Sequence, residues 1–513
     1  MKIPRLALLT LIALMLTALS ARAAAVPENI DILAKGGKGG WLNVTRPLTA
    51  ADIQSHPVIL LDFWTYGCIN CQQVVPDLEA LEKEFGDKLL IIGVHSAKFA
   101  AESGNDRILA AAKRFGLKHP VINDSDFAIW KAFGVQAWPT LVLMDSQGSV
   151  IRMFEGEGHK DEIAGQISKS LTLFGSLSGK AAKPAAVPLA NDKDNSVLSF
   201  PARLAAMPDV PTAGVYMLYV ADSGHNRVLG FDESGAVNAV IGSGARGLKD
   251  GDFKTAQFDH PRGIAVFKQD LYVADTGNHA LRRVDFKKHM VETVAGTGAR
   301  GENYDVRDED GKTTALASPW DVEPLADGRT LAIAMAGLHQ IWTYDTKTGT
   351  VKSTVGSGKE GIKDGPAIDA DLAQPSALSR EGDTLFFADA ESSSLRQWQG
   401  GQVKTLIGTG LFDFGQVDGQ YPKAMLQHAQ GLFAEKDRII IADTYNNAIR
   451  IYDRTTATLK TVTLSPKNAL FEPGDVLSVG GNTVYVADTN HNRIDRLDLS
   501  SGTLTPLALK LPH

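Results

Sequence analysis

The first part of the chain alternates short apolar runs with stretches of helical periodicity. Residues 58–63 and 89–94 are nearly continuous apolar runs, rich in valine, isoleucine and leucine, which is typical of buried central strands. Helical spacing of apolar residues follows the first run, and residues 108–115 show it again. Residues 141–144 and 150–154 predict a hairpin, because Ser-Gln-Gly lies between them. This order of strand, helix, strand, helix and hairpin predicts an α/β domain.

The rest of the chain repeats one pattern, which reads YVADSGHNRVLGFD in its first copy. Four copies are similar to one another and two are degenerate; the six begin at Tyr219, Tyr272, Ala332, Phe386, Ile440 and Tyr485. Each unit has four short apolar runs separated by glycines and prolines, and successive units lie 45 to 60 residues apart. Four-stranded repeats of about this length are propeller blades. We therefore predict an all-β six-bladed propeller, whose last unit supplies its own outer strand at residues 504–509.

Each repeat carries a polar stretch after its second apolar run. An aspartate, a histidine, an asparagine and an arginine recur in the same order at residues 222–227 and 488–493. An acid in this position typically binds local backbone N–H groups and a nearby arginine. We therefore predict a turn for these residues rather than a catalytic or metal site. Met335 replaces the aspartate in the third copy, which predicts a weaker turn there and indicates either drift or a specialised face.

Composition marks the boundaries of the domains. Residues 1–23 combine a short basic region, an apolar stretch and small residues at a cleavage site, which predicts a signal peptide; an uncleaved anchor is the alternative. Residues 176–196 are rich in alanine, proline and charged residues without periodicity, which predicts a linker. The expected domains are residues 24–175 and 197–513. The mature chain is expected to have no membrane span and to be periplasmic or secreted.

The overall charge argues against strongly charged partners. The 513 residues are 44% hydrophobic and 22% charged, with a formal net charge of -7. Such a chain is typical of soluble globular proteins, and its net charge gives no attraction to nucleic acid or to an anionic membrane. We therefore expect no nucleic-acid partner.

The chain contains only two cysteines, Cys68 and Cys71, at the start of a predicted helix. This spacing allows one disulfide, and a helix start favours the thiolate of a cysteine placed there. A structural staple is a weaker explanation, because closing a loop of about four residues stabilises a protein by only about 2 kcal/mol. The pair therefore predicts redox chemistry.

Two alternatives for the cysteines stay open, an inert pair and a metal site. Haem attachment would need a histidine where Gln72 stands, and no histidines show the paired spacing of zinc ligands. We expect no metal and no organic cofactor besides a redox-active disulfide between Cys68 and Cys71.

Several residues around the cysteines resemble thioredoxin-like domains, in particular the exported TlpA and DipZ-type branch. Asp62 lies six residues before Cys68, where the family keeps a buried acid, and Trp64 follows it in its usual place. Pro76 lies where the active-site helix of the family is kinked. Trp138-Pro139-Thr140 matches the cis-proline loop that faces the cysteines in these proteins. The resemblance implies a thioredoxin-like fold over about 100 residues.

The resemblance also implies roles for these residues. Cys68 would be the accessible nucleophile and Cys71 the buried resolving thiol. Asp62 would relay a proton during exchange, although a plain strand-end acid is the alternative.

The aromatic and proline positions carry their own expectations. Pro139, if its peptide bond is cis, would leave the flanking backbone free to pair with an extended substrate. Trp138 would narrow the substrate groove, and Trp64 is either a supporting site residue or core packing.

The repeats resemble NHL repeats over residues 197–513, and the two halves together resemble proteins that join a thioredoxin-like domain to an NHL propeller. This combination implies an exported thiol–disulfide oxidoreductase whose propeller holds the client. Protein thiols or disulfides would be its clients, and a membrane thiol electron donor is a further candidate partner. Two other functions stay open: a propeller scaffold with a vestigial redox site, and a propeller-centred hydrolase or lyase. The sequence does not set the direction of exchange.

Overall fold

The computed structural model describes residues 27–177, 186–190, 196–208, 216–467 and 469–511. The predicted signal peptide and much of the predicted linker lie outside these residues. The chain divides into two compact units. The first contains residues up to Thr65, Val74–Ala97 and Leu117–Ala190, and the second contains Tyr66–Gln73, Lys98–Gly116 and the chain from Asn191 onward. No helix among the described residues is long and apolar enough to cross a membrane.

The first unit is built on a six-stranded sheet in the order β1-β4-β3-β2-β5-β6. Its central strand β2 (Val58–Trp64) is buried along its whole length. It pairs in parallel with β3 (Leu89–His95) and antiparallel with β5 (Thr140–Asp145). The other strands are β1 (Gly40–Leu42), β4 (Val121–Asn123) and β6 (Val150–Glu155). The predicted strands and the hairpin are therefore confirmed.

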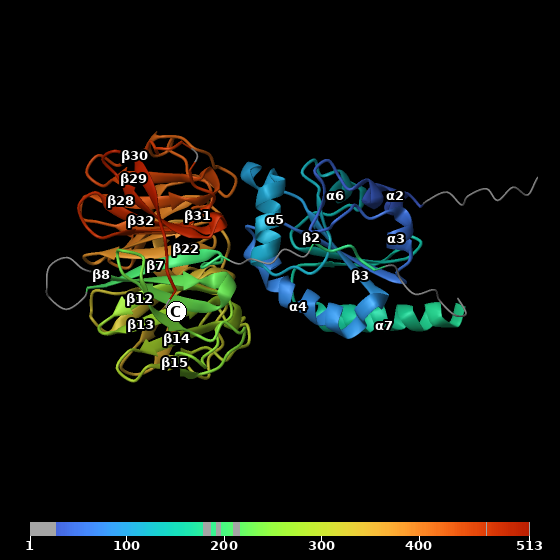
Figure 1. Cartoon of the computed structure of the whole chain (residues 1–513), viewed down its shortest axis with the longest axis horizontal. Helices are drawn as coiled ribbons and strands as arrows, with labels where there is room; N and C mark the ends of the chain where they lie inside the picture. The colour runs from blue at the N-terminus through green and yellow to red at the C-terminus, as the bar shows by residue number, and fades with distance from the viewer. Residues whose placement is uncertain (1–26, 178–185, 191–195, 209–215, 468, 512–513) are drawn as a thin grey trace, which may run out of the picture. The chain divides into compact units, whose positions relative to one another are not determined.

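Helices cover both faces of this sheet (Figure 1). Side chains alternate along β2, so Ile59 and Leu61 enter one apolar cluster, and Val58 and Leu60 enter another. The first cluster includes residues of α2 (Glu28–Lys35), α3 (Ala50–Gln54) and α6 (Ala128–Ala132). The second includes residues of α4 (Ile69–Phe85) and α7 (Lys160–Leu177). Burial on both faces explains why the strands are continuously apolar.

The second unit contains six antiparallel blades of four strands each, and four of them gain an outer strand of two residues. The six-bladed propeller is therefore confirmed. The first three blades contain β7 (Pro201–Pro208), β8 (Tyr216–Asp222), β9 (Arg227–Phe231), β10 (Val237–Ile241), β11 (Gly251–Asp252), β12 (Pro261–Phe267), β13 (Asp270–Asp275), β14 (Ala280–Asp285), β15 (Met290–Ala295), β16 (Glu309–Asp310), β17 (Pro319–Pro324), β18 (Thr330–Met335), β19 (Gln340–Asp345) and β20 (Thr350–Val355). The last three contain β21 (Gly365–Pro366), β22 (Pro375–Glu381), β23 (Thr384–Asp389), β24 (Ser394–Gln399), β25 (Gln402–Ile407), β26 (Gly419–Gln420), β27 (Gly431–Ala434), β28 (Arg438–Asp443), β29 (Ala448–Asp453), β30 (Thr458–Thr461), β31 (Pro473–Ser478), β32 (Thr483–Asp488), β33 (Arg493–Asp498) and β34 (Thr503–Leu507). The unit also contains the short helices η2 (Ala100–Ser103) and α5 (Asn105–Arg114).

The aspartate of the repeat ends the second strand of a blade and fixes the turn that follows. Asp275 accepts the backbone N–H of Asp259 at 2.8 Å, and Arg282 donates to its other oxygen at 2.8 Å. A 3-10 turn follows, and then His279 adopts the left-handed conformation at φ 48. This confirms the predicted turn role, and the pairing recurs as Asp222–Arg227, Asp389–Arg396, Asp443–Arg450 and Asp488–Arg493.

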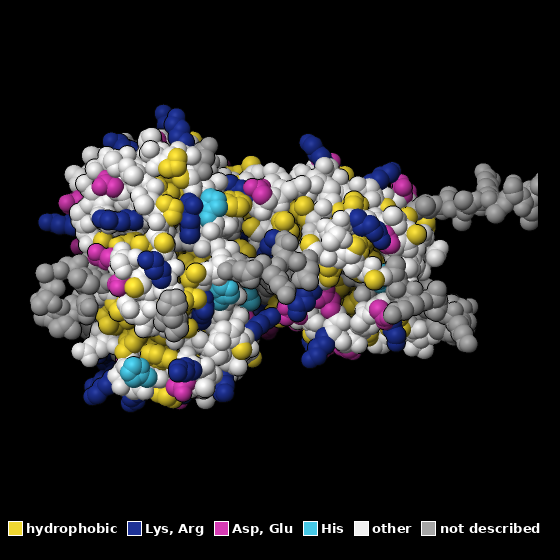
Figure 2. Space-filling model, in the orientation of Figure 1, with side chains coloured by type: hydrophobic (Ala, Val, Ile, Leu, Met, Phe, Trp, Pro, Cys, Tyr) yellow, Lys and Arg dark blue, Asp and Glu magenta, His cyan; other side chains and the backbone are white. Residues whose placement is uncertain are grey.

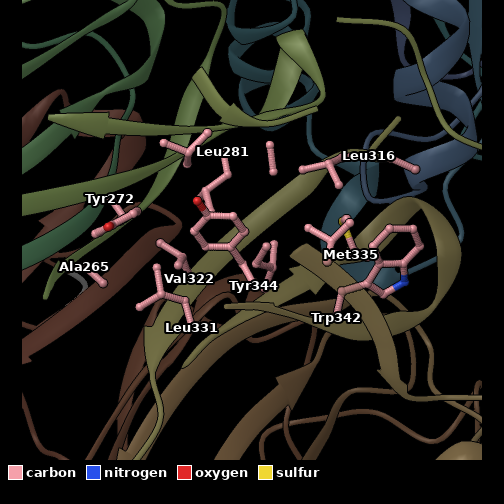
Figure 3. Packing of buried hydrophobic residues seen from close by; sticks show 14 of the residues in the cluster. Ala265, Tyr272, Leu281, Leu316, Val322, Leu331, Met335, Trp342 and Tyr344 are labelled. Atoms are coloured by element: carbon pink, nitrogen blue, oxygen red, sulfur yellow. The ribbon is translucent and has the colours of Figure 1, made fainter. Parts of the chain in front are cut away.

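The third blade replaces this ion pair with an apolar cluster. Met335 stands at the aspartate position and Trp342 at the arginine position, both fully buried and close together (Figure 3). The Trp342 indole N–H donates to Gln340 Oε1 at 2.9 Å. The turn keeps its shape, with His339 at φ 53, and a weaker turn at Met335 stays a prediction. Apolar packing holds this turn in place of the charged pair.

The ring is closed by the C-terminal segment. Strand β34 is the outer strand of the last blade, which confirms that this unit supplies its own outer strand. Beyond it, the Lys510 N–H donates to Gly235 O at 2.9 Å, and the Val237 N–H donates to Lys510 O at 3.0 Å. The last blade is thereby joined to the first. On the face shown in Figure 2, acidic and basic side chains are interspersed over the propeller.

Candidate functional site

The two cysteines lie at the first turn of α4. Cys68 directly precedes the helix, and its carbonyl accepts the Gln72 N–H at 3.2 Å, which makes Cys68 the N-cap residue. Its side chain is partly exposed, whereas Cys71, one turn further along, is 3% exposed. Neither cysteine is in a disulfide. A thiol at this position lies beside the N–H groups that a helix start leaves without intrahelical acceptors.

Side chains distant in the sequence hold the backbone of this segment. The Ile69 N–H donates to Gln374 Oε1 at 2.5 Å, and the Gln374 amide donates to Glu391 Oε2 at 2.5 Å. On the other side of Cys68, the Gly67 N–H donates to Glu102 Oε1 at 3.0 Å. These bonds involve buried groups on both sides, so they fix the backbone that carries the exposed thiol.

A buried ion pair supplies a positive charge near Cys68. Lys98 pairs with Glu391, and their side chains are 13% and 3% exposed. Burial disfavours the ammonium, but the Glu391 carboxylate outweighs it and raises the pKa of Lys98, with a smaller contribution from Cys68. Burial also opposes the charge of Glu391, yet His428 and Lys98 lower its pKa to about 2. Both groups therefore stay charged at neutral pH.

A second polar cluster surrounds Tyr66, two residues before Cys68. The Tyr66 hydroxyl donates to Glu472 Oε1 at 2.7 Å, and Arg107 Nη1 donates to the same oxygen at 3.1 Å. The Tyr445 ring lies edge-on to Tyr66, with centroids 5.3 Å apart. Burial, together with the charge of Glu472, raises the pKa of Tyr66 well above its ordinary value, so the phenol remains a hydrogen-bond donor.

Ile69, one of the two residues between the cysteines, has apolar surroundings. Ile69 packs with Trp320, Ala336 and Ala390, which come from the third and fourth blades. The other blades carry a serine or threonine at the position of these alanines: Ser223, Thr276, Thr444 and Thr489. Thr276 donates its hydroxyl to Pro319 O at 2.6 Å. The two blades that depart most from the repeat are therefore the two that contact Ile69.

Asp62 lies within β2 of the first unit. It is 3% exposed, and its Oδ1 accepts no hydrogen bond from the described residues. Burial raises the pKa of Asp62 to about 7, and the charge of His119 opposes this only in part. A carboxyl with this pKa can take up and release a proton at neutral pH, which a strand-end acid in water cannot do.

The remaining predicted residues also lie in the first unit. Trp64 is buried at 2% exposure and meets the His95 ring edge-on at 5.0 Å. The Trp138–Pro139 bond is cis, as the resemblance implied. The Trp138 indole N–H donates to Ser96 O at 3.0 Å, and its ring packs on Trp130 with centroids 4.6 Å apart. Trp64 and Trp138 thus both have packing roles within their own unit.

Sequence reasoning missed the residues that surround the cysteine segment. They are Lys98, Glu102, Gln374, Glu391 and Glu472, and no spacing in the sequence links them to Cys68. One signal was available, because the third and fourth repeats lose the hydroxyl-bearing residue of the turn. Those alanines mark the blades that adjoin the cysteine segment.

Comparisons with known proteins agree with both halves of the fold. Residues 57–150 match the thioredoxin-like family and residues 258–283 match the NHL repeat. Over 122 residues, the chain is 25% identical to the thiol-disulfide oxidoreductase YkuV of Bacillus subtilis (strain 168), which covers 24% of this chain and 80% of that protein.

Two relatives match along both halves. The chain is 37% identical over 494 residues to the protein SUPPRESSOR OF QUENCHING 1, chloroplastic, of Arabidopsis thaliana, covering 90% of this chain and 46% of that protein. It is 36% identical over 511 residues to NHL repeat-containing protein 2 of Bos taurus, covering 91% of this chain and 70% of that protein. The identity of 36% over 70% of the Bos taurus protein shows that the chain belongs to the NHL repeat-containing protein 2 family.

Proposed function

We propose that this chain is a thiol–disulfide oxidoreductase in which Cys68 forms the mixed disulfide and Cys71 resolves it. The observation that carries the proposal is the pairing of a partly exposed thiol at the N-cap of α4 with a buried thiol one turn inside. The similarity to YkuV supports the same chemistry. The charged Lys98 lies close enough to Cys68 for the two groups to interact electrostatically.

The exchange has two steps. In the reducing direction, the Cys68 thiolate attacks one sulfur of a client disulfide, that bond breaks, and the other client sulfur leaves as a thiolate. The Cys71 sulfur then gives up its proton and attacks Cys68, which releases the second client sulfur. The client gains two electrons and two protons, and the enzyme keeps a Cys68–Cys71 disulfide. The oxidising direction is the reverse.

Further parts of the proposal concern location and partners. We propose that the protein acts in the periplasm or as a secreted protein, on protein thiols or disulfides that the propeller binds. A membrane thiol electron donor would re-reduce Cys68–Cys71 if the protein is a reductase. Asp62 would serve as proton relay, which its pKa of about 7 suits.

The test is turnover of insulin disulfides by the full chain from residue 24, with dithiothreitol as reductant. We expect catalysis above the reductant alone, and loss of all catalysis in Cys68→Ser. Cys71→Ser should form the first mixed disulfide but turn over poorly. Equal rates for the wild type and the Cys68→Ser variant would contradict the proposal and favour a propeller scaffold with vestigial cysteines.

The reduction potential of the Cys68–Cys71 pair sets the direction. A value near or below about -250 mV is expected for a reductase, and a value near about -120 mV for an oxidant. Equilibration with glutathione, followed by alkylation of the free thiols, measures it.

A further inference from the structure

Arg262 is the second residue of β12, an innermost strand of the propeller, and no described residue forms an ion pair with it. Its Nη2 donates to Gln430 Oε1 at 2.7 Å, and its guanidinium carbon lies 4.0 Å from the centroid of the Trp320 ring. Within the part of the chain that the structure describes, neither interaction brings a carboxylate to the guanidinium. The side chain is only partly exposed.

The other arginines that are buried in the described part of the propeller are each paired with a carboxylate. Arg282, Arg396 and Arg450 pair with the aspartates of their repeats. Arg203 pairs with both Asp321 and Asp475. Arg262 is therefore an exception among arginines that otherwise follow one rule, namely that a buried charge is paired. Burial, together with the charge of Arg114, lowers the pKa of Arg262 to about 9.

The charges around Arg262 are of both signs, because Arg114 and Arg203 lower its pKa whereas Asp321 and Tyr445 raise it. Arg114, at the end of α5, approaches Glu472 Oε2 at 3.8 Å, and Arg107 approaches Glu472 Oε1 at 3.1 Å. A single carboxylate is thus shared by two arginines and by the Tyr66 hydroxyl. Two guanidinium groups thus share the Glu472 carboxylate, and one of them, that of Arg114, also acts on Arg262.

These groups lie beside the cysteine segment. The Arg262 guanidinium stacks on the Trp320 ring, and Trp320 also packs against Ile69, which lies between the two cysteines in the sequence. Glu472, which holds Arg107 and Arg114, is bonded to Tyr66, two residues before Cys68. Trp320 and Glu472 therefore contact residues on either side of Cys68, namely Ile69 and Tyr66.

We propose that Arg262, with Arg114 beside it, is an anion site that binds a carboxylate of the thiol or disulfide on which Cys68 acts. This rests on the proposed function. Arginine binds carboxylate through two parallel N–H donors, and Gln430 and Trp320 orient the guanidinium for this. The site selects clients with an acidic group close to their disulfide, because only these reach both groups at once.

Binding is tested without redox chemistry, in a full chain that carries Cys68→Ser and Cys71→Ser. The probes are glutathione disulfide and its fully esterified form, and a disulfide-linked peptide pair with free or amidated carboxyl groups. Isothermal titration calorimetry at low salt should show the acids binding at least about tenfold more tightly than the esters or amides. Arg262→Met should abolish this preference, and Arg262→Lys should keep part of it. Arg307→Met, which removes an exposed arginine, is the matched control and should change nothing.

Equal affinity for acid and ester, or a preference that survives Arg262→Met, would overturn the proposal. Preference for glutathione disulfide alone identifies a low-mass thiol as the ligand, and preference for the acidic peptide identifies a protein client. The binding assay uses a variant without cysteines, so it does not depend on disulfide exchange. A failure of the insulin assay is therefore distinguishable from a failure of the binding assay. Circular dichroism of Arg262→Met shows whether the propeller still folds.

Discussion

Gln374 Oε1 accepts the backbone N–H of Ile69, the first residue of α4, which directly follows Cys68. The two residues are 305 positions apart in the chain, and both are buried. Gln374 also donates to Glu391, the acid that pairs with Lys98. One glutamine thus joins the backbone of the cysteine segment to the ion pair nearby.

Replacing this glutamine should destabilise the second unit. In Gln374→Ala the Ile69 N–H and a Glu391 oxygen lose their partners while they remain buried, which costs about 1–3 kcal/mol. Urea unfolding followed by tryptophan fluorescence measures the loss. Gln402→Ala, at an exposed position of β25, is the control and should stay within about 0.5 kcal/mol of the wild type. If both variants unfold at the same urea concentration, Gln374 has no such role.

Replacing the resolving thiol should trap clients. Cys71→Ser keeps the shape of the site but leaves a hydroxyl, which cannot displace a disulfide. We expect mixed disulfides through Cys68 to accumulate in the compartment where the protein acts, seen as higher-mass bands that disappear on reduction. The Cys68→Ser, Cys71→Ser chain is the control. Bands of equal intensity from this control would mean that the adducts do not form through Cys68.

Asp62 should make the stability of the first unit depend on pH. Its folded-state pKa of about 7 lies above the ordinary value of 3.8, so the folded protein keeps a proton that the unfolded chain releases between these values. The stability linked to this group is therefore fully present below pH about 4 and is lost as the pH rises to about 7. The total loss is on the order of a few kcal/mol.

The Asp62→Asn variant removes this titration. It should match the wild type near pH 4 and be the more stable protein at pH 8, as measured by urea unfolding across the pH range. Because other buried acids titrate as well, the quantity to compare is the difference between the two proteins. A difference that does not change with pH would show that the pKa of Asp62 is the same in the folded and unfolded states.

The apolar third blade allows an exchange experiment. Met335→Asp places a carboxylate in a buried site without its arginine, and should destabilise the propeller by about 3–5 kcal/mol. Adding Trp342→Arg restores the pairing seen between Asp275 and Arg282, and should recover part of the loss. Thermal unfolding of both variants tests this. If the double variant is less stable than Met335→Asp alone, the blade has repacked too far for the pair to form.

Much of this architecture was readable from the residues, because the patterns are local. The apolar run at residues 58–63 shows a strand buried on both faces, and the copies of Asp222 mark the end of the second strand in each blade. The position of Cys68 at the start of α4 follows from the spacing of apolar residues after it. Each of these features depends on neighbours within about ten positions.

The surroundings of the cysteines were not readable in this way. Gln374, Glu391 and Glu472 contact the segment through turns that are hundreds of residues away, and each residue type is ordinary in a propeller turn. The packing around Met335 was not readable either, because the sequence does not show that Trp342 fills the arginine position on the adjacent strand. Long-range contacts decided the first case, and packing between adjacent strands decided the second.

The ribosome makes the cysteines well before it makes the polar residues that contact the cysteine segment. Gln374 follows Ile69 by 305 residues, and Glu472 follows Tyr66 by 406. At about 5–20 residues per second, the ribosome completes these partners roughly 15–80 s after the cysteines. The ring itself closes only when Lys510 reaches Gly235. Each newly made molecule therefore carries both thiols through a period in which the groups that later enclose them do not yet exist, and the thiols acquire their final environment as the last blade is completed.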